Sequence, residues 1–488
     1  MSKDPDYFKQ LDSLKEKMKA LNFAGGDPLE IGPLFVRNAA AATLFDDKLG
    51  RYAGAHGEYP YKRSVFEFFT KEMGILQKHK SDCKNVIFAN GVTHLWRYFI
   101  KRVKLQGEEK FPGKEPVILM GNLAYGLCIP VAEKQGVKVY GVPLNEKNGY
   151  RMQAEDLRET IEEIEKDGTK KVVCLKVDNP HNPTGAILQE DDVKALARVC
   201  INKNVRVFDD QVYYGLEHGD KKPFAFGAVQ GMQELAFTAI SLSKAAAIPG
   251  LRAGVGIGTN RDMSFMAHEI SDDMVSIPIP CQAAVASYLD PENKDKREAY
   301  LADLKAEYRF RAKLMAAMIN GIDSVDLTAK EHLRVRESLG KVFPEKRAAC
   351  EALIQTGIKG ARMVNANPDA GFFGMIDVEA AKGEDSVDIA KDLIKDGLVF
   401  MLPGKIFSAP LFNGQEPEEN KTLMRATFAF SKPELLIVGA LGLNEAVQKM
   451  KQRGGKTYET LTQEQRSQRE KTDGLAAVLG KRISGNMM

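Results

Sequence analysis

The sequence has few cysteines and histidines, which are the residues that form disulfides and that bind zinc most often. Its 488 residues include six cysteines and seven histidines. No CxxC pair occurs, and no cysteine or histidine has a partner at zinc-site spacing. In particular, His56, His94 and His181 show no ligand spacing. We therefore expect reduced cysteines in the core and no metal site.

Long apolar runs are also missing. The amino-terminal stretch MSKDPDYFKQLDSLKEKMKAL is charged and amphipathic, and it lacks the apolar centre of a signal peptide. Elsewhere no uninterrupted apolar run reaches the ~18–20 residues that cross a bilayer. We expect a cytoplasmic protein that does not bind membranes.

The chain has little net charge of either sign. Its 69 basic and 66 acidic residues give a net charge of +3. Such a balance offers no broad basic surface for nucleic acid. The content of 44% hydrophobic and 28% charged residues is that of a globular protein with a large core. The expected partner is a small molecule.

Between residues 85 and 260, short β-rich runs alternate with amphipathic helical patterns. The runs with strand character are NVIFAN, PVILMG, VKVYGVPL, KVVCLKV, VRVFDD, AFTAISLS and AGVGIG. The segments with helical spacing are THLWRYFIKRVKL, GLCIPVAEKQG, AEDLRETIEEIEKDG and QEDDVKALARVCINKN. This alternation predicts an α/β fold with a mainly parallel sheet and ligands at the carboxyl ends of its strands.

The rest of the chain groups into a second, smaller unit. A helix is expected over 295–321, followed by strands in AGFFGMIDV, LVFMLPG and LMRATFAF and a helix in KPELLIVGALGLNEAVQKMKQ. The predicted organisation is an amino-terminal segment of the small domain (1–45), a large domain (46–310), the small carboxy-terminal domain (311–452) and a polar tail (453–488).

One lysine stands in surroundings that suggest a site. In SLSKAAAIPGLRAGVGIG, Lys244 lies between small residues, and Arg252 follows eight positions later. The final GVGIG lacks the GxGxxG spacing of a dinucleotide loop, so close backbone packing is expected there instead. A lysine beside serine is usually a surface residue. The interpretation of Lys244 as a functional residue therefore depends on the other motifs of the chain.

Three other segments carry polar residues at the ends of predicted strands. VDNPHNPTGAI (177–187) is a rigid turn whose asparagines can point into a cleft. VFDDQVYYG (207–215) ends a strand with Asp210 and Tyr213. ANGVTHLWRYF (89–99) passes through Gly91 into a helix whose first amides can bind an anion.

Together these segments resemble the class I/II aminotransferases, which are fold type I enzymes dependent on pyridoxal 5′-phosphate (PLP). The resemblance covers roughly residues 20–450. It rests on segments in the family's order: GDPLEIGP, RYAGAHGEYPYKR, ANGVT, NPHNPTG, DDQVY, SLSK with the later arginine, NPDAGFF, FMLPGKIF and MRATFAF. It implies a mixed, mainly parallel sheet wrapped by helices, and a smaller α+β domain built from both chain ends.

The resemblance implies catalytic roles for several residues. Lys244 would bind PLP covalently and move a proton at the substrate α-carbon, which requires a lowered pKa. Asp210 would keep the pyridine nitrogen protonated. Asn182 and Tyr213 would hydrogen-bond the phenolic oxygen, and Tyr125 would stack on the ring where aspartate-specific relatives usually have tryptophan.

The resemblance also implies how the phosphate and the substrate are bound. The residues matching the phosphate site are Gly91, Val92, Thr93, Ser241 and Arg252. Tyr52 would reach the phosphate from the neighbouring subunit of a homodimer. Arg425 would bind the substrate α-carboxylate, helped by the backbone of Gly26 and by Asn182.

The leading hypothesis is thus an aminotransferase that moves an amino group between an L-amino acid and a 2-oxo acid by a ping-pong mechanism. A PLP-dependent lyase, decarboxylase, synthase or oxidase on the same fold is the alternative. A non-catalytic PLP-binding regulator is a third reading, which Lys244, Asp210, Arg425 and the lack of a DNA-binding module oppose. The sequence does not identify the substrate side chain.

Overall fold

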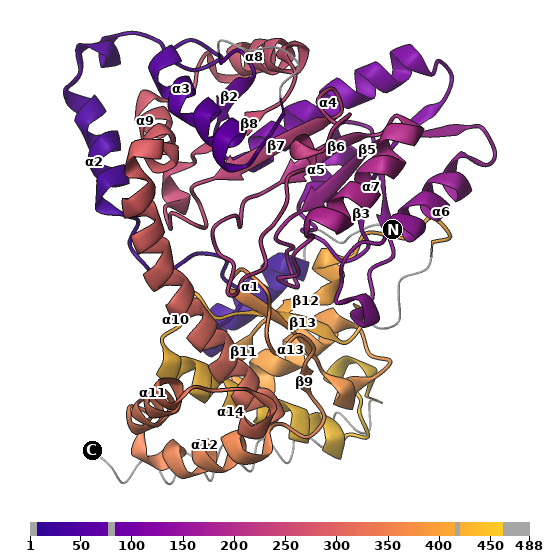
Figure 1. Cartoon of the computed structure of the whole chain (residues 1–488). Coiled ribbons are helices and arrows are strands. Elements are labelled where there is room, and N and C mark those ends of the chain that lie inside the picture. The colour runs from indigo at the N-terminus through magenta and orange to yellow at the C-terminus, as the bar shows by residue number, and fades with distance from the viewer. Residues whose placement is uncertain (1–6, 77–82, 415–419, 462–488) are drawn as a thin grey trace.

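The computed structural model describes residues 7–76, 83–414 and 420–461. Figure 1 shows two units joined by a long helix, α10 (Lys294–Asn320). One unit holds the large sheet and the other holds a small sheet. The helix expected over 295–321 is therefore confirmed, and it runs from one unit to the other.

A seven-stranded sheet forms the centre of the large unit, in the order β2-β8-β7-β6-β5-β3-β4. The five strands from β7 to β4 are parallel, whereas β8 is antiparallel to both of its neighbours. All seven predicted strands are confirmed. They are β2 (Val86–Ala89), β3 (Glu115–Gly121), β4 (Lys138–Val142), β5 (Lys170–Asp178), β6 (Arg206–Asp210), β7 (Ala236–Ser241) and β8 (Gly254–Ile257).

Helices cover this sheet because parallel strands need crossover connections. The four predicted crossover helices are confirmed as α4 (Val92–Lys110), α5 (Cys128–Lys134), α6 (Ala154–Glu165) and α7 (Glu190–Lys203). Helices that the sequence patterns did not single out complete this unit: α2 (Leu34–Ala42), α3 (Tyr59–Glu67), α8 (Asn260–Met274) and α9 (Ile279–Leu289).

The small unit contains an antiparallel sheet in the order β12-β13-β10-β9, as well as a separate parallel pair, β1 with β11. Its strands are β1 (Leu21–Asn22), β9 (Arg362–Met363), β10 (Phe373–Asp377), β11 (Val399–Phe400), β12 (Leu402–Pro403) and β13 (Leu423–Thr427). Its helices are α1 (Tyr7–Met18), α11 (Ala329–Gly340), α12 (Pro344–Thr356), α13 (Ser386–Gly397) and α14 (Pro433–Gln452).

Both ends of the chain contribute to the small unit. Helix α1 packs on α13, and β1 extends β11. Helix α2, however, packs on α9 of the large unit. The predicted boundary at residue 45 thus falls after a helix whose contacts lie with the large sheet's unit.

Close packing explains the glycine-rich strand β8. A Cβ on Gly256 would lie 2.4 Å from the Phe237 ring, and one on Gly254 would lie 2.8 Å from the backbone of Gly91. The GVGIG segment is a buried strand, as predicted. All six cysteines are buried and free, which confirms the expectation for them. Within the described ranges, no helix has the length and apolarity needed to cross a bilayer.

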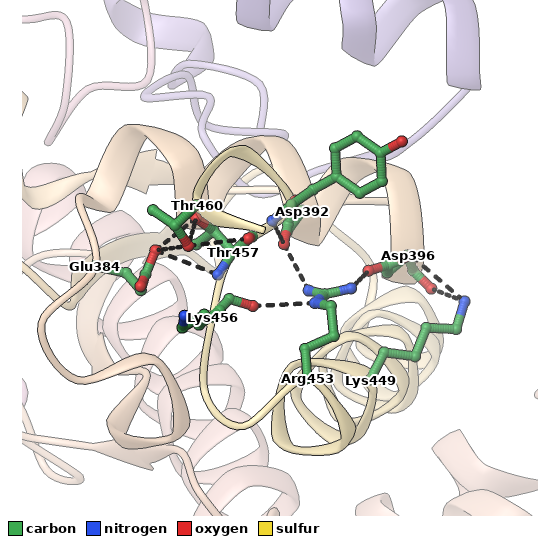
Figure 2. Close-up of polar contacts among 9 residues, drawn as sticks. Glu384, Asp392, Asp396, Lys449, Arg453, Lys456, Thr457 and Thr460 are labelled. Atoms are coloured by element: carbon green, nitrogen blue, oxygen red, sulfur yellow. Dashed lines mark hydrogen bonds and ion pairs between the residues drawn. The ribbon is translucent and has the colours of Figure 1, made fainter. Parts of the chain in front are cut away.

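The first residues of the predicted polar tail are packed against α13 (Figure 2). Arg453 contacts two buried carboxylates, with Nη2 2.5 Å from Asp392 Oδ2 and Nη1 2.8 Å from Asp396 Oδ2. Burial raises the pKa of Asp392 to about 6, while Arg453 opposes that rise. The arginine thus stabilises a charged cluster inside the small unit. Residues 462–488 lie outside the described residues.

Replacing this arginine should destabilise the small unit. We expect Arg453→Ala to lower the free energy of unfolding by about 3–5 kcal/mol, because buried Asp392 loses its arginine partner and Asp396 loses the shorter of its two ion pairs. Lys449→Ala is the control: Lys449 also contacts Asp396 but is 46% exposed, and its loss should cost less than about 1 kcal/mol. Urea unfolding of both variants measures the difference. Equal effects would contradict this account of the cluster.

Candidate active site

A cavity of about 480 Å³ lies where the two units meet. Strands β5, β6 and β7 end at the same edge of the large sheet and bring Asp178, Asp210 and Ser241 to its wall. Arg425 on β13 lines it from the small unit. The predicted site residues that line this cavity are Gly26, Val92, Thr93, Tyr125, Asn182, Asp210, Tyr213, Ser241, Lys244, Arg252 and Arg425.

Lys244 follows β7 and places its amine inside the cavity. Its Nζ donates a hydrogen bond to the Gly26 carbonyl oxygen at 2.7 Å. Burial lowers the pKa of Lys244 to about 8, against a smaller opposing effect of Asp27. A sizeable fraction of this amine is therefore unprotonated near pH 8, as a nucleophile requires.

Asp210 is the last residue of β6, and its carboxylate is buried. Its Oδ2 lies 3.1 Å from Lys176 Nζ, whereas its Oδ1 has no hydrogen-bond partner. Burial raises the pKa of Asp210 to about 6, and Lys176 opposes that rise. A buried carboxylate oxygen without a partner is costly unless a ligand supplies a donor.

Arg425 is buried, and no carboxylate of the described chain lies within ion-pair distance of it. Its Nη2 donates to the Ala24 carbonyl oxygen at 2.7 Å and its Nη1 donates to Asn182 Oδ1 at 3.4 Å. Its Nε has no partner. A guanidinium held in this way is ready to bind a ligand carboxylate through two hydrogen bonds.

The turn between β2 and α4 presents groups that can bind an anion. Gly91 precedes α4 with φ 82° and ψ 166°, a conformation that is essentially restricted to glycine. A Cβ at this position would lie 2.6 Å from Arg252 Nη2. The first amides of α4, at Val92 and Thr93, thus lie near a guanidinium at a helix N-terminus, an arrangement suited to phosphate.

Comparison with known proteins identifies the family. The sequence profile of "Aminotransferase class I and II" matches residues 19–436. The chain belongs to the class I/II aminotransferases. As a member of this family it is a PLP-dependent enzyme that transfers amino groups between amino acids and 2-oxo acids.

The named relatives have low sequence identity to this chain, but the matches extend over most of its length. Kynurenine–oxoglutarate transaminase 3 of Rattus norvegicus is 22% identical over 323 residues, which cover 65% of this chain and 69% of that protein. A probable aspartate/prephenate aminotransferase of Aquifex aeolicus is 21% identical over 434 residues, covering 88% and 91%. These low identities are compatible with differences in substrate.

Solved structures share the fold. A double mutant of Thermus thermophilus aspartate aminotransferase matches with a TM-score of 0.70 at 19% identity, over 91% of this chain and 97% of that one. The aromatic aminotransferase of Pyrococcus horikoshii matches with a TM-score of 0.67 at 20% identity, over 91% and 99%. The aminotransferase therefore has the fold type I architecture predicted from its sequence.

The cavity of this aminotransferase fits PLP. The unpartnered Asp210 Oδ1 offers an acceptor for a protonated ring nitrogen, and the turn at Gly91 offers donors for a phosphate. The amine of Lys244 lies within the same cavity. When bound, PLP supplies an electron sink for the bond that breaks at the substrate α-carbon.

Two tyrosines complete the walls of the cavity. Burial raises the pKa of Tyr125 to about 12, and burial also raises the pKa of Tyr213 well above its usual value. Both phenols therefore stay protonated and can donate hydrogen bonds. The Tyr213 ring packs edge-on against Phe373 at 5.0 Å between ring centroids, which fixes its position.

Tyr52 is not among the residues that line the cavity of the single chain. Its side chain is 84% exposed. The structure also shows residues that sequence reasoning missed, above all Lys176 and Asp178 on β5. The signal available for them was a lysine inside the otherwise apolar run VVCLKV (172–177), followed at once by an aspartate. Sequence reasoning also missed four residues that line the cavity from the small unit, Phe400, Leu402, Ile406 and Phe407.

A methyl group at the glycine of the turn should disrupt phosphate binding. We expect Gly91→Ala to weaken PLP affinity by roughly tenfold or more, because the new Cβ meets Arg252 and the backbone conformation becomes strained. Titration of the apoenzyme with PLP can be followed by fluorescence of Trp96, the single tryptophan, which lines the cavity.

Gly113→Ala is the matched control for this substitution. Gly113 also has a positive φ, of 80°, but a Cβ there would meet nothing within 4 Å. It should leave PLP affinity unchanged. If Gly91→Ala bound PLP as tightly as the control, the turn at Gly91 would not be the phosphate site.

Proposed function

We propose that Lys244 is the lysine that binds PLP, that Asp210 is the partner of its ring nitrogen and that Arg425 binds the substrate α-carboxylate. One observation carries this proposal: a buried amine with a lowered pKa, a buried carboxylate oxygen without a partner and a buried guanidinium without a counterion share one cavity. PLP offers an aldehyde for the amine and a protonated ring nitrogen for the carboxylate oxygen, and an amino acid offers a carboxylate for the guanidinium.

The other lining residues take supporting roles. The amides of Val92 and Thr93, the Ser241 hydroxyl and the Arg252 guanidinium hold the phosphate. The predicted donor at Gly91 is already used within the turn, because its amide donates to the Ala89 carbonyl oxygen at 2.8 Å. Asn182 and Tyr213 hydrogen-bond the phenolic oxygen of PLP, and Tyr125 stacks on its ring. The Gly26 backbone lies beside the substrate carboxylate. Support comes from the lining of the cavity and from the Lys244–Gly26 hydrogen bond.

Lys244 also moves the proton in the reaction. With a pKa near 8, its amine can accept the proton from the substrate α-carbon and return it at the cofactor. Because bound PLP would hold the amino group between the two half-reactions, an amino acid would leave its nitrogen before the 2-oxo acid binds. This order is a ping-pong cycle. The enzyme would work in the cytoplasm.

The substrate side chain is proposed to be largely apolar and to carry no second carboxylate. Phe400, Leu402, Ile406 and Phe407 line the cavity beside Arg425, whose guanidinium carbon lies 5.0 Å from the Phe407 ring centroid. The one lining cation without a proposed role is Lys15, within the described chain. It already pairs with Asp12 at 2.7 Å and Glu16 at 3.1 Å. A second substrate carboxylate would have to displace these partners.

A panel of amino acids tests the reaction and the side chain together. With the holoenzyme and pyruvate or 2-oxoglutarate as acceptor, L-leucine, L-methionine and L-phenylalanine should show kcat/KM values roughly tenfold or more above that of L-aspartate, because its second carboxylate would be buried unpaired. Formation of 2-oxo acid, ammonia and carbon dioxide is measured separately.

Lys244→Ala provides the negative control and should form no 2-oxo acid. Release of ammonia or carbon dioxide in place of acceptor amination would favour the lyase, oxidase or decarboxylase alternative. A preference for aspartate would reject the apolar side chain and leave transamination standing.

A homodimer with shared active sites is also proposed. Apolar side chains around Tyr52 are unusually exposed, and Phe45 is 90% exposed. The exposed members of this surface are Ile31, Leu34, Leu44, Phe45, Tyr52 and Tyr59. These six residues fall within residues 31–59, and such a concentration of exposed large apolar side chains is typical of a segment that forms a subunit interface. In the dimer, Tyr52 would reach the phosphate of the partner's site.

Mixed dimers test the shared site. A Tyr52→Phe subunit paired with a Lys244→Ala subunit should contain one site with both substitutions and one with neither. Activity should therefore exceed that of the separate homodimers and approach half the wild-type value per dimer, measured after purification with two affinity tags. A mixed dimer without recovered activity, or a fully active monomer in sedimentation, would refute the shared site.

A further inference from the structure

The centre of the large sheet contains a buried ammonium for which the functional roles above have no use. Lys176 lies on β5, between β3 and β6, and its side chain is 1% exposed. Removing such a charge from water costs several kcal/mol, so it persists only where opposite charges surround it. Its partners therefore indicate what it does.

Two carboxylates hold this ammonium. Nζ of Lys176 pairs with Asp178 Oδ1 and lies 3.1 Å from Asp210 Oδ2. Burial alone lowers the pKa of Lys176, but the attraction of Asp178 and its neighbours outweighs burial and raises the pKa well above the usual value. Lys176 is thus a fixed positive charge and, unlike Lys244, not a nucleophile.

The two carboxylates lie side by side. The strand register pairs Asp178 with Asp210 across β5 and β6. Adjacent strands are about 4.8 Å apart. Two buried carboxylates this close, with no cation between them, would share a proton, since both cannot ionise in a poorly solvated site. The ammonium of Lys176 removes that competition.

The oxygens of Asp210 have different surroundings. Oδ2 is held by Lys176, while Oδ1 is buried and has no partner, and the residue lines the cofactor cavity. The large majority of buried carboxylate oxygens in proteins have a hydrogen-bond partner, so the bare Oδ1 needs an explanation. Asp262 shows the usual case, because both of its oxygens hydrogen-bond Arg206.

We propose that Lys176 is a positioning residue that keeps Asp210 ionised and holds Oδ2, so that Oδ1 stays available to the protonated ring nitrogen of PLP. Asp178 is its charge-balancing partner. This inference rests on the proposed role of Asp210.

The net charge of Lys176, Asp178 and Asp210 explains why both Lys176 and Asp178 are needed. Two carboxylates and one ammonium sum to a single negative charge, which a protonated pyridine ring neutralises. Lys176→Met removes the cation, and Asp178 and Asp210 then compete for a proton. Asp178→Asn leaves the group neutral overall, so that it attracts a cationic ring less. The double variant restores one negative charge on Asp210.

Binding of pyridoxamine 5′-phosphate to the apoenzyme tests this proposal, because this ligand has no aldehyde to react with Lys244. Trp96 fluorescence follows the titration. Each single variant, Lys176→Met and Asp178→Asn, should weaken binding by about tenfold or more. The double variant should recover most of the wild-type affinity. Thermal melting of each apoenzyme shows that the variants are folded.

The 1-deaza analogue of the ligand, in which a C–H group replaces the ring nitrogen, is the matched control. Its affinity should change little in any of these variants. Equal losses for both ligands would show a general structural role and overturn the proposal. A double variant that binds worse than either single variant would overturn it as well.

Asp210→Asn separates this inference from the function on which it rests. If Asp210→Asn weakens binding of pyridoxamine 5′-phosphate while Lys176→Met does not, the role of Lys176 is wrong and that of Asp210 stands. If Asp210→Asn leaves the affinity unchanged, Asp210 is not the partner of the ring nitrogen, and the proposed role of Asp210 fails.

Discussion

Buried charge without a protein partner is the constraint on which this active site depends. Asp210 Oδ1 and Arg425 Nε have no hydrogen-bond partner within the described structure, and burial lowers the pKa of Lys244. Each of these groups costs folding free energy, because its desolvation is not offset by a protein partner. The rest of the molecule supplies the rigidity that keeps them in place: strands of the large sheet for Asp210, and β13 for Arg425.

Other buried charges show the opposite arrangement. Arg206 meets Asp262 through two hydrogen bonds, and Arg453 lies between Asp392 and Asp396. These groups are satisfied inside the protein and have nothing left to offer a ligand. Asp210 and Arg425 differ from these ion pairs because each keeps an unpartnered polar atom while lining the cofactor cavity, in line with the clustering of perturbed groups at functional sites.

Sequence patterns were sufficient to predict features that depend on a single strand or helix. Every strand of the large sheet was predicted, because each is a short apolar run between turns. Eleven predicted site residues line the cavity, and several of them follow strand ends in recognisable motifs. The proposed role of Lys176 could not be predicted from the sequence, because it depends on the pairing of β5 with β6. This pairing places Lys176 beside Asp210. Tyr52 stays a prediction, because its proposed role lies in a second subunit.

The two lysines near the cofactor cavity show how environment assigns roles. Burial lowers the pKa of Lys244, and Arg425 and Arg252 add to the effect, so its neutral form is favoured. Lys176 is buried even more completely, yet Asp178 and Asp210 keep it charged. Residues of one type whose pKa values are driven apart take different chemical roles. One lysine can therefore act as nucleophile and proton carrier, while the other can only fix the charge of a neighbouring carboxylate.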